Sequence, residues 1–257
     1  MFNKRKVLML SGVVSVMLAV SSASWGMIFF GEDLGLGEST PLASFPNASA
    51  ARTNFLASLV GVGTETFEAP DQTAGQTGPL TLTFPGAGTA TLSAGGSIAS
   101  VTPGTTNGVG RYATSGSQYW ETSSSAFGVT FSNPIAAFGF YGIDIGDFGG
   151  QVTVTTTGGG STTYNVGNTM NGLGGSVLFW GLIDTANPFT SIAFGNTAAG
   201  TDYFGFDDMT IGSVAQVCGQ PGAPACPNPE PASMALLSLG LAGLAVVRRR
   251  NQLMLAR

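Results

Sequence analysis

The chain has 257 residues, of which 39 are glycine, nine are lysine or arginine, fourteen are aspartate or glutamate, and none is histidine. Without histidine, catalysis by a Ser-His-Asp or Cys-His arrangement and the usual zinc hydrolases are excluded. Between Trp25 and Asn228 the bases are Arg52 and Arg111 against thirteen acids, so this part of the chain repels nucleic acid and favours cations. The composition is typical of a Gly- and Thr-rich extracellular β protein rather than a cytosolic enzyme.

The first 26 residues have the three parts of a secretory signal peptide. Basic residues at 4–6 precede an apolar segment at 7–20, and small residues follow at 21–24. This order is the one that signal peptidase recognises. We expect residues 1–26 to form the signal peptide, with cleavage between Ala23 and Gly26. A permanent N-terminal anchor is the alternative, but the apolar segment is short of the ~20 residues that a membrane span needs.

Residues 27–63 read as an N-terminal extension that contains one short helix. Helical spacing runs from Ala50 to Val60, with Asn47 or Ser49 as N-cap and Gly61 as the stop. The apolar residues on one side of this helix are Phe55, Leu59 and Val60.

From residue 64 onward the pattern changes to strands. Apolar residues alternate with threonine at 80–84 and 152–155, which predicts half-buried antiparallel strands. Turn residues such as Asn133-Pro134 and Gly158 to Gly160 interrupt the apolar segments, and no long helix separates them, so a parallel βαβ sheet is not expected.

About ten strands are expected, at 64–70, 79–86, 90–101, 110–116, 119–123, 127–146, 150–167, 176–184, 189–196 and 203–212. Their number and spacing predict an all-β fold, an antiparallel β-sandwich of jelly-roll type over residues 64–215.

A Cys-, Pro- and Gly-rich linker follows at 216–228. Cys218 and Cys226 enclose seven residues, and in an exported protein a disulfide between them is the expected state. Free thiols are the alternative. Two isolated cysteines without histidine do not supply a zinc site, so we expect the disulfide to stiffen the linker.

The apolar segment Ala232–Val247 predicts a C-terminal transmembrane helix. It is a little shorter than a full span but able to insert with its flanking residues. Arg248, Arg249 and Arg250 follow directly and would stay on the cytoplasmic side, because positive charge sets orientation. The alternative of a buried amphipathic helix is disfavoured, since the segment has no polar face.

Pro229-Glu230-Pro231 stands directly before this helix. The tripeptide, the apolar helix and the arginine cluster together resemble the PEP-CTERM sorting signal of Gram-negative, exopolysaccharide-producing bacteria, over residues 229–250. The resemblance implies recognition by an exosortase, a membrane protease-transpeptidase that cuts near the tripeptide. The short tail at 251–257, expected to be cytoplasmic, departs from the family, which usually stops at the basic cluster.

Acidic residues concentrate in three places in the body. They are Glu65 and Glu68, then Asp144 and Asp147, then Asp202, Asp207 and Asp208. Two carboxylates straddling a sugar bond suffice for glycoside hydrolysis, so a carboxylate-based glycoside hydrolase is one alternative. These acids stand in turns or strand ends, where a hard cation would be bound as readily.

Calcium is the stronger alternative for these acids. Phe204–Ile211 resembles the last strand of jelly-roll carbohydrate-binding modules, many of which hold a structural calcium between an early strand and a late one. The resemblance implies Asp208 with Glu65 or Glu68 as ligands, and Gly-rich turns would add carbonyl oxygens. Otherwise, adjacent Asp207 and Asp208 place one carboxylate in solvent and one in a turn network.

Aromatic residues supply a second candidate site. Exposed rings could form a groove on which sugars stack, and the candidates are Tyr119, Trp120, Tyr141 and Trp180. Packing in the core is the alternative, because neighbouring phenylalanines alternate with glycine as inward-facing strand residues do.

These features predict an exported, non-catalytic protein. It would be held briefly in the inner membrane and then processed toward the cell surface or the exopolysaccharide matrix. The partners expected are signal peptidase, an exosortase and exopolysaccharide, with no nucleic acid and no certain cofactor beyond a structural calcium. A secreted carbohydrate-binding module and a secreted hydrolase remain alternatives.

Overall fold

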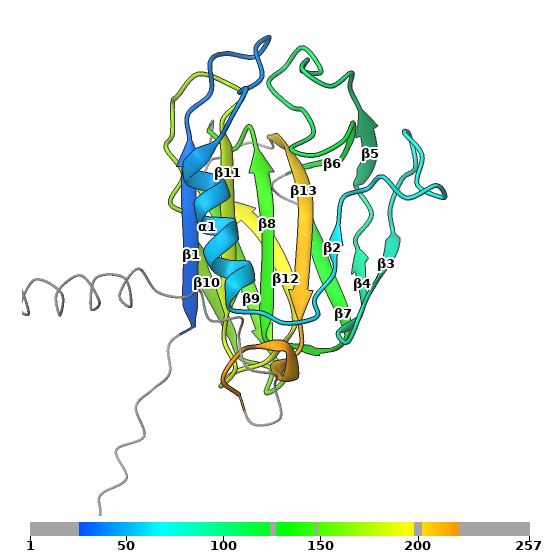
Figure 1. Ribbon diagram of the computed structural model, residues 1–257, viewed down its shortest axis with the longest axis vertical. Coiled ribbons are helices and arrows are strands. Elements are labelled where there is room, and N and C mark those ends of the chain that lie inside the picture. The colour runs from blue at the N-terminus through cyan, green and yellow to red at the C-terminus, as the bar shows by residue number, and fades with distance from the viewer. Residues whose placement is uncertain (1–25, 124–126, 147–148, 198–201, 221–257) are drawn as a thin grey trace, which may run out of the picture.

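The computed structural model of the protein describes residues 26–123, 127–146, 149–197 and 202–220. Within these residues two antiparallel sheets pack face to face, and one α-helix lies against the outer face of the larger sheet (Figure 1). The predicted all-β antiparallel sandwich with one short N-terminal helix is confirmed.

The larger sheet has seven strands and the smaller sheet has six. The order of the seven-stranded sheet is β1 (Met27–Asp33), β11 (Val177–Ile183), β8 (Ala137–Ile143), β13 (Tyr203–Gly212), β6 (Gln118–Ser123) and β5 (Gly96–Ser100), with β2 (Thr64–Glu65) also paired to β13. The order of the six-stranded sheet is β10 (Ser161–Asn165), β9 (Gly150–Thr156), β12 (Phe189–Asn196), β7 (Gly128–Ile135), β4 (Gly88–Leu92) and β3 (Leu80–Phe84).

The main core lies between the two sheets. In β3 every second residue is a buried apolar side chain and the intervening threonines are exposed. From the larger sheet, Phe138 and Phe140 enter the same core, where the ring of Phe140 stacks on that of Phe206 at 5.0 Å between centroids. Full burial of one such side chain contributes about 1.5–3 kcal/mol, so this aromatic layer is a large part of what holds the sheets together.

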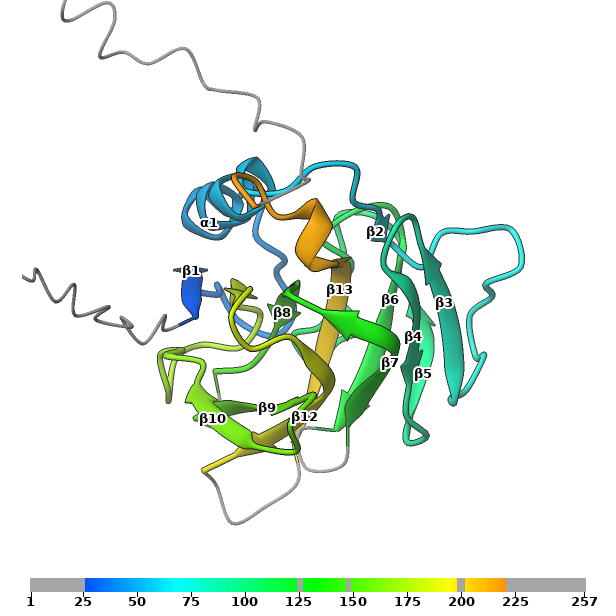
Figure 2. The same cartoon turned by 90° about the horizontal axis from the view of Figure 1, so that it is seen from below.

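A second core lies on the other face of the larger sheet, under helix α1 (Pro46–Ala57) (Figure 2). The ring of Phe55 is fully buried against Gly139 and Gly181, which pair across β8 and β11. A Cβ atom at either glycine would lie 2.9 Å from this ring. The two glycines therefore let the helix approach the sheet, and both faces of β8 and β11 are buried.

The helix boundaries differ from the prediction. The helix begins at Pro46 instead of Ala50 and ends at Ala57 instead of Val60, and its N-cap position is Phe45, which makes no side-chain capping bond. The carboxylate of Asp33, at the end of β1, accepts hydrogen bonds from the backbone N–H of Asn47 (3.3 Å) and Ala48 (2.9 Å). A residue distant in sequence therefore satisfies the free donors of the first turn.

The expected strands at 90–101, 127–146 and 150–167 each form two strands, and two more segments differ in type from the prediction. Met27–Asp33, expected within an extension, forms an edge strand of the larger sheet. The strand expected at 110–116 is a loop, because several of its backbone N–H groups donate to side chains and not to a neighbouring strand. The N–H groups of Thr114 and Ser115 both donate to the buried carboxylate of Asp207.

The outer face of the six-stranded sheet is covered by short polar side chains. None of its six strands contains a charged residue. Strand register aligns one hydroxyl from each strand in a single row: Thr81, Thr91, Thr130, Ser191, Thr155 and Ser161. Neighbouring hydroxyls bond to each other, as between Thr81 and Thr91 at 2.9 Å. We call this set the hydroxyl row.

Several predicted segments lie outside the described residues. They are nearly all of the signal peptide, Cys226, and the whole of residues 229–257 with the expected transmembrane helix. In the part of the chain that the structure describes, no helix has the length and apolar character needed to cross a membrane.

Candidate functional site

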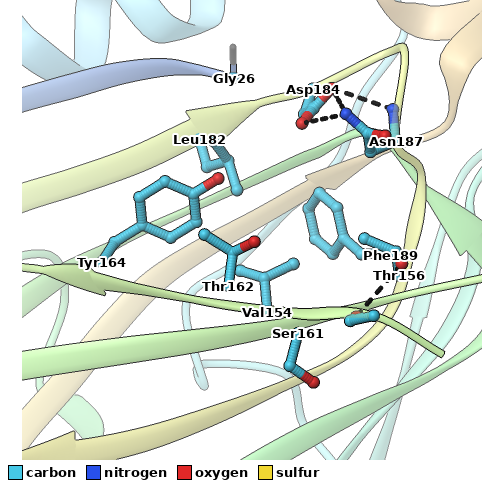
Figure 3. A pocket seen from close by; sticks show the side chains of 11 residues that line it. Gly26, Val154, Thr156, Ser161, Thr162, Tyr164, Leu182, Asp184, Asn187 and Phe189 are labelled. Atoms are coloured by element: carbon cyan, nitrogen blue, oxygen red, sulfur yellow. Dashed lines mark hydrogen bonds between the residues drawn. The ribbon is translucent and has the colours of Figure 1, made fainter.

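A cleft of about 380 Å³ opens at one edge of the sandwich (Figure 3). It lies between the β9–β10 hairpin of the smaller sheet and the end of β11 in the larger one. The hairpin turn is closed by Gly159, whose φ of +79° suits glycine. Because strand residues alternate in direction, Thr162 and Tyr164 face the cleft, whereas Thr163 bonds to Thr153 on the outer face of the sheet at 2.8 Å.

The wall of the cleft is apolar. Val154 and Phe189 from the smaller sheet and Leu182 from β11 line it, and all three are buried. The ring of Tyr164, which is partly exposed, packs 6.1 Å from the buried ring of Trp180. Contact with Trp180 therefore holds the Tyr164 ring in position, while part of that ring stays exposed to solvent.

Asp184 and Asn187 form the polar side of the cleft. Asp184 is 8% exposed, and its carboxylate accepts hydrogen bonds from the backbone N–H of Ala186 (3.1 Å) and Asn187 (3.0 Å). It also accepts one from the side-chain amide of Asn187 at 3.1 Å (Figure 3). This local turn fixes both side chains, with the Asn187 carbonyl still available to a ligand.

Two hydroxyl groups in the cleft, those of Thr162 and Tyr164, make no hydrogen bond to any residue that the structure describes. Burial raises the pKa of the Tyr164 hydroxyl above its usual value, and the nearby Asp184 carboxylate adds to that rise. The phenol therefore keeps its proton at neutral pH and can donate.

These groups together suit binding of a polyhydroxyl ligand better than hydrolysis. Asp184 is the one carboxylate among the described residues that line the cleft. Glycoside hydrolysis needs two. An apolar wall, an aromatic ring and a few fixed polar groups are the usual content of a small-ligand site.

Asp208, predicted as a calcium ligand, lies in a buried network next to helix α1. β13 is irregular between Asp207 and Thr210, and Asp208 has a φ of +49°. Its carboxylate accepts a bond from Ser115 Oγ (2.7 Å) and pairs with the Arg52 guanidinium (3.4 Å). The Asp207 carboxylate beside it is fully buried, and burial, followed by the charge of Asp208, raises the pKa of Asp207 to about 8.

The other two predicted calcium ligands bind protein donors as well. The Glu65 carboxylate accepts from the N–H of Phe67 (2.6 Å), and that of Glu68 accepts from the N–H of Ser117 (2.6 Å). Among the described residues, no three acidic, cysteine or histidine side chains gather as a metal site. Glu65, Glu68 and Asp208 thus do not form one group of three, and calcium held by one pair of these carboxylates with backbone carbonyls stays a prediction.

The predicted sugar-stacking residues are in the core. Tyr119, Trp120 and Trp180 are 0% exposed and Tyr141 is 4% exposed. None of the four therefore offers a ring face to solvent, which corrects their interpretation as stacking platforms. Tyr141 lies under helix α1, 5.7 Å from the Arg52 guanidinium, and Trp120 and Trp180 fill the core between the sheets.

Asp144, a candidate acid for hydrolysis, belongs to an ion-pair cluster. Arg111 pairs with Asp144 at 3.4 Å and with Glu121 at 3.1 Å. A second, open hollow of about 720 Å³ lies above this cluster, with Asp202 and the exposed Tyr203 on its rim. Asp147 lies outside the described residues.

The residues of the Tyr164 cleft were not among the predicted site residues. Two signals for them exist in the sequence. Tyr164 is the only large residue of β10, and an aspartate followed by asparagine three residues later, at 184 and 187, is typical of a fixed turn. Neither signal shows that the β9–β10 hairpin lies next to the turn at residues 184–187.

Comparison with known families identifies the C-terminal segment. Residues 229–250 match the family model described as the PEP-CTERM protein-sorting motif. The resemblance noted for Pro229, Glu230, Pro231 and the arginines at 248–250 is thus confirmed, although these residues lie outside the described part of the structure. No curated protein matches this chain.

Solved structures that resemble this chain include two carbohydrate-binding modules. One is the CBM22-1 xylan-binding domain of Xyn10C from Paenibacillus barcinonensis, with 15% identity over 60% of this chain and 94% of that domain, at a TM-score of 0.34. The other is TmCBM61 in complex with β-1,4-galactotriose, with 13% identity over 48% of this chain and 86% of that one, at a TM-score of 0.27.

Proposed function

We propose that this protein is an exported, non-catalytic component of the cell surface or exopolysaccharide matrix, sorted by an exosortase through residues 229–250. The observation that carries the proposal is the PEP-CTERM motif at these residues. Export and membrane anchoring are inferred from the two ends of the chain, where seven of the nine basic residues lie.

Each end has a defined part in this proposal. Signal peptidase removes the leader between Ala23 and Gly26, as the order of basic, apolar and small residues implies. The apolar segment 232–247 then halts export and holds the protein in the inner membrane, because Arg248–Arg250 do not cross the bilayer. The exosortase cuts near Glu230, and a Cys218–Cys226 disulfide stiffens the linker before it.

The composition of the body is consistent with an extracellular location. The body is rich in hydroxyl side chains, and its six-stranded sheet has no charged residue. A catalytic role has no support in the cleft, which holds a single carboxylate among its described lining residues.

Mass spectrometry of the protein from its native source tests the sorting. We expect an N-terminus between residues 24 and 27 and a C-terminus near residues 229–231, with the tail to Arg257 removed. Replacing Glu230 and its two flanking prolines with alanine should leave the C-terminal tail in place.

Pro227→Ala is the matched control, since this proline stands two residues before the tripeptide and its replacement should not change processing. Mature molecules that all extend through Arg257 would contradict the proposal.

A further inference from the structure

We propose that the cleft around Tyr164 binds a neutral saccharide unit of an extracellular polysaccharide. This inference rests on the proposed function, since export is what brings the cleft to such polymers. The ligand is identified by four features of the cleft: an aromatic ring, hydroxyl donors, a fixed carboxylate and amide pair, and the absence of a basic group among the described lining residues.

The aromatic ring supplies the apolar contact. A sugar ring has C–H groups on its faces and hydroxyls around its edge, so it packs against an aromatic ring while its edge makes hydrogen bonds. Tyr164 is partly exposed at the mouth, and the buried Trp180 ring supports it from behind at 6.1 Å. The apolar wall of Leu182 and Phe189 continues this surface inward.

The hydrogen-bonding groups match both roles of a sugar hydroxyl, which donates and accepts. Thr162 and Tyr164 offer hydroxyls without a partner among the described residues. Asp184 and the Asn187 carbonyl offer acceptors, and their mutual hydrogen bond at 3.1 Å fixes them before a ligand arrives. Such a site loses little entropy on binding.

The charge of the cleft selects the class of sugar. One carboxylate, Asp184, and no basic residue lie among the described lining residues. A uronic acid or sulfated sugar would place its negative charge near this carboxylate in a partly desolvated site, which is unfavourable. Neutral sugars meet no such repulsion.

The size of the cleft limits the length of ligand that it holds. Its volume of about 380 Å³ is at the lower end of the ~300–1,000 Å³ that small-ligand sites span. The cleft therefore accommodates a short portion of a polysaccharide, with the rest of the polymer outside.

The test is binding of the purified full-length protein to an oligosaccharide array that includes neutral, uronic and sulfated members, followed by calorimetry with the best neutral ligand. Tyr164→Phe and Thr162→Val each remove one hydroxyl and should raise Kd roughly two- to tenfold. Tyr164→Ala also removes the ring and should raise Kd by more than tenfold.

Thr163→Val is the matched control, because this neighbour in β10 points to the outer face of the sheet and bonds to Thr153. Its Kd should equal that of the wild type. Circular dichroism spectra that match the wild type show that each variant has folded.

Three results would overturn the inference: no neutral oligosaccharide binds, uronic or sulfated members bind better, or Tyr164→Ala leaves Kd unchanged. The sorting proposal is tested independently of this inference. Retention of the C-terminal tail in native protein would refute processing by an exosortase and would not alter Kd measured with purified chain.

Discussion

Asp207 carries a fully buried carboxylate whose pKa is raised from 3.8 to about 8, first by burial and then by the charge of Asp208. Hydrogen bonds from the N–H and hydroxyl of Thr114, both accepted by Asp207 Oδ2, oppose this rise. The folded protein therefore holds a proton that the unfolded chain has already released between about pH 4 and pH 8.

This difference in bound protons sets the direction in which the free energy of unfolding changes with pH. The stability that the proton provides is fully present below about pH 4 and is lost as pH rises through 8, so the free energy of unfolding should fall by a few kcal/mol between pH 5 and pH 8.5. Asp207→Asn should flatten this slope in urea denaturation, whatever its effect at a single pH. The exposed Asp71→Asn is the control, and an unchanged slope in the Asp207 variant would refute the assignment.

Gly139 is a residue whose lack of a side chain matters directly. A Cβ there would lie 2.8 Å from Phe179 Cζ and 2.9 Å from Phe55 Cε1. Gly139→Ala should therefore lower the free energy of unfolding by about 1–3 kcal/mol through overpacking. Gly158→Ala is the control, because its added methyl group meets nothing within 4 Å. Thermal or urea denaturation should show nearly the wild-type free energy of unfolding for this control. An equal loss of stability in the two variants would argue against close packing of the helix on the sheet.

At the scale of elements, strand β1 and helix α1 depend on each other through Asp33. Its carboxylate caps the first turn of the helix and also bonds to the Asn47 side chain at 3.0 Å. Asp33→Ala should cost about 0.5–2 kcal/mol of stability and speed amide exchange in the first turn. Asn47→Ala removes the two bonds that its side-chain amide donates, to Asp33 and to the Glu32 carbonyl, and leaves both backbone caps in place. It should therefore cost less, as denaturation of both variants would show; the reverse ranking would contradict the capping role.

The strands were the most predictable elements, because alternation of apolar residues and threonine directly reports which face is buried. β3 follows this pattern residue by residue. Alternation of apolar and polar residues does not predict burial where both faces of a strand are covered. β8 and β11 place Tyr141 and Trp180 on opposite sides of one sheet, and the helix covers one side while the smaller sheet covers the other. Sequence spacing does not show that both sides are covered.

The helix start and the loop at 110–116 were mispredicted for a related reason. In each case a carboxylate from a distant strand accepts the backbone N–H groups, Asp33 for the helix and Asp207 for the loop. Local propensity covers a few neighbouring residues and contains no information on such partners. The cleft was missed likewise, since Tyr164 lies in β10 of the smaller sheet and Asp184 directly follows β11 of the larger one.

At the scale of the whole molecule, charge is divided between the ends of the chain and its body. The tail with its arginines is the sorting segment, and its three-part order could be read from sequence alone because the pattern is contiguous. The body has its few bases engaged with carboxylates: Arg52 with Asp208, and Arg111 with Asp144 and Glu121. An acidic body that does not attract nucleic acid follows from this arrangement.

The cleft and the exit of the chain toward its C-terminus lie at the same end of the sandwich. The Asp184 N–H donates to Ala136, whose own N–H donates to Gly212, the last residue of β13. The 3₁₀ helix η1 (Val214–Gln216) follows, and the backbone N–H of Cys218 donates to the carbonyl of Ser58, which directly follows helix α1.

Eight residues separate Gln220 from Pro229, a stretch that reaches at most about 30 Å when fully extended. If residues 232–247 anchor the protein in the membrane, as proposed, this length keeps the mouth of the cleft close to the bilayer. Removal of the tail, as proposed, would end this restriction on the distance between the cleft and the membrane.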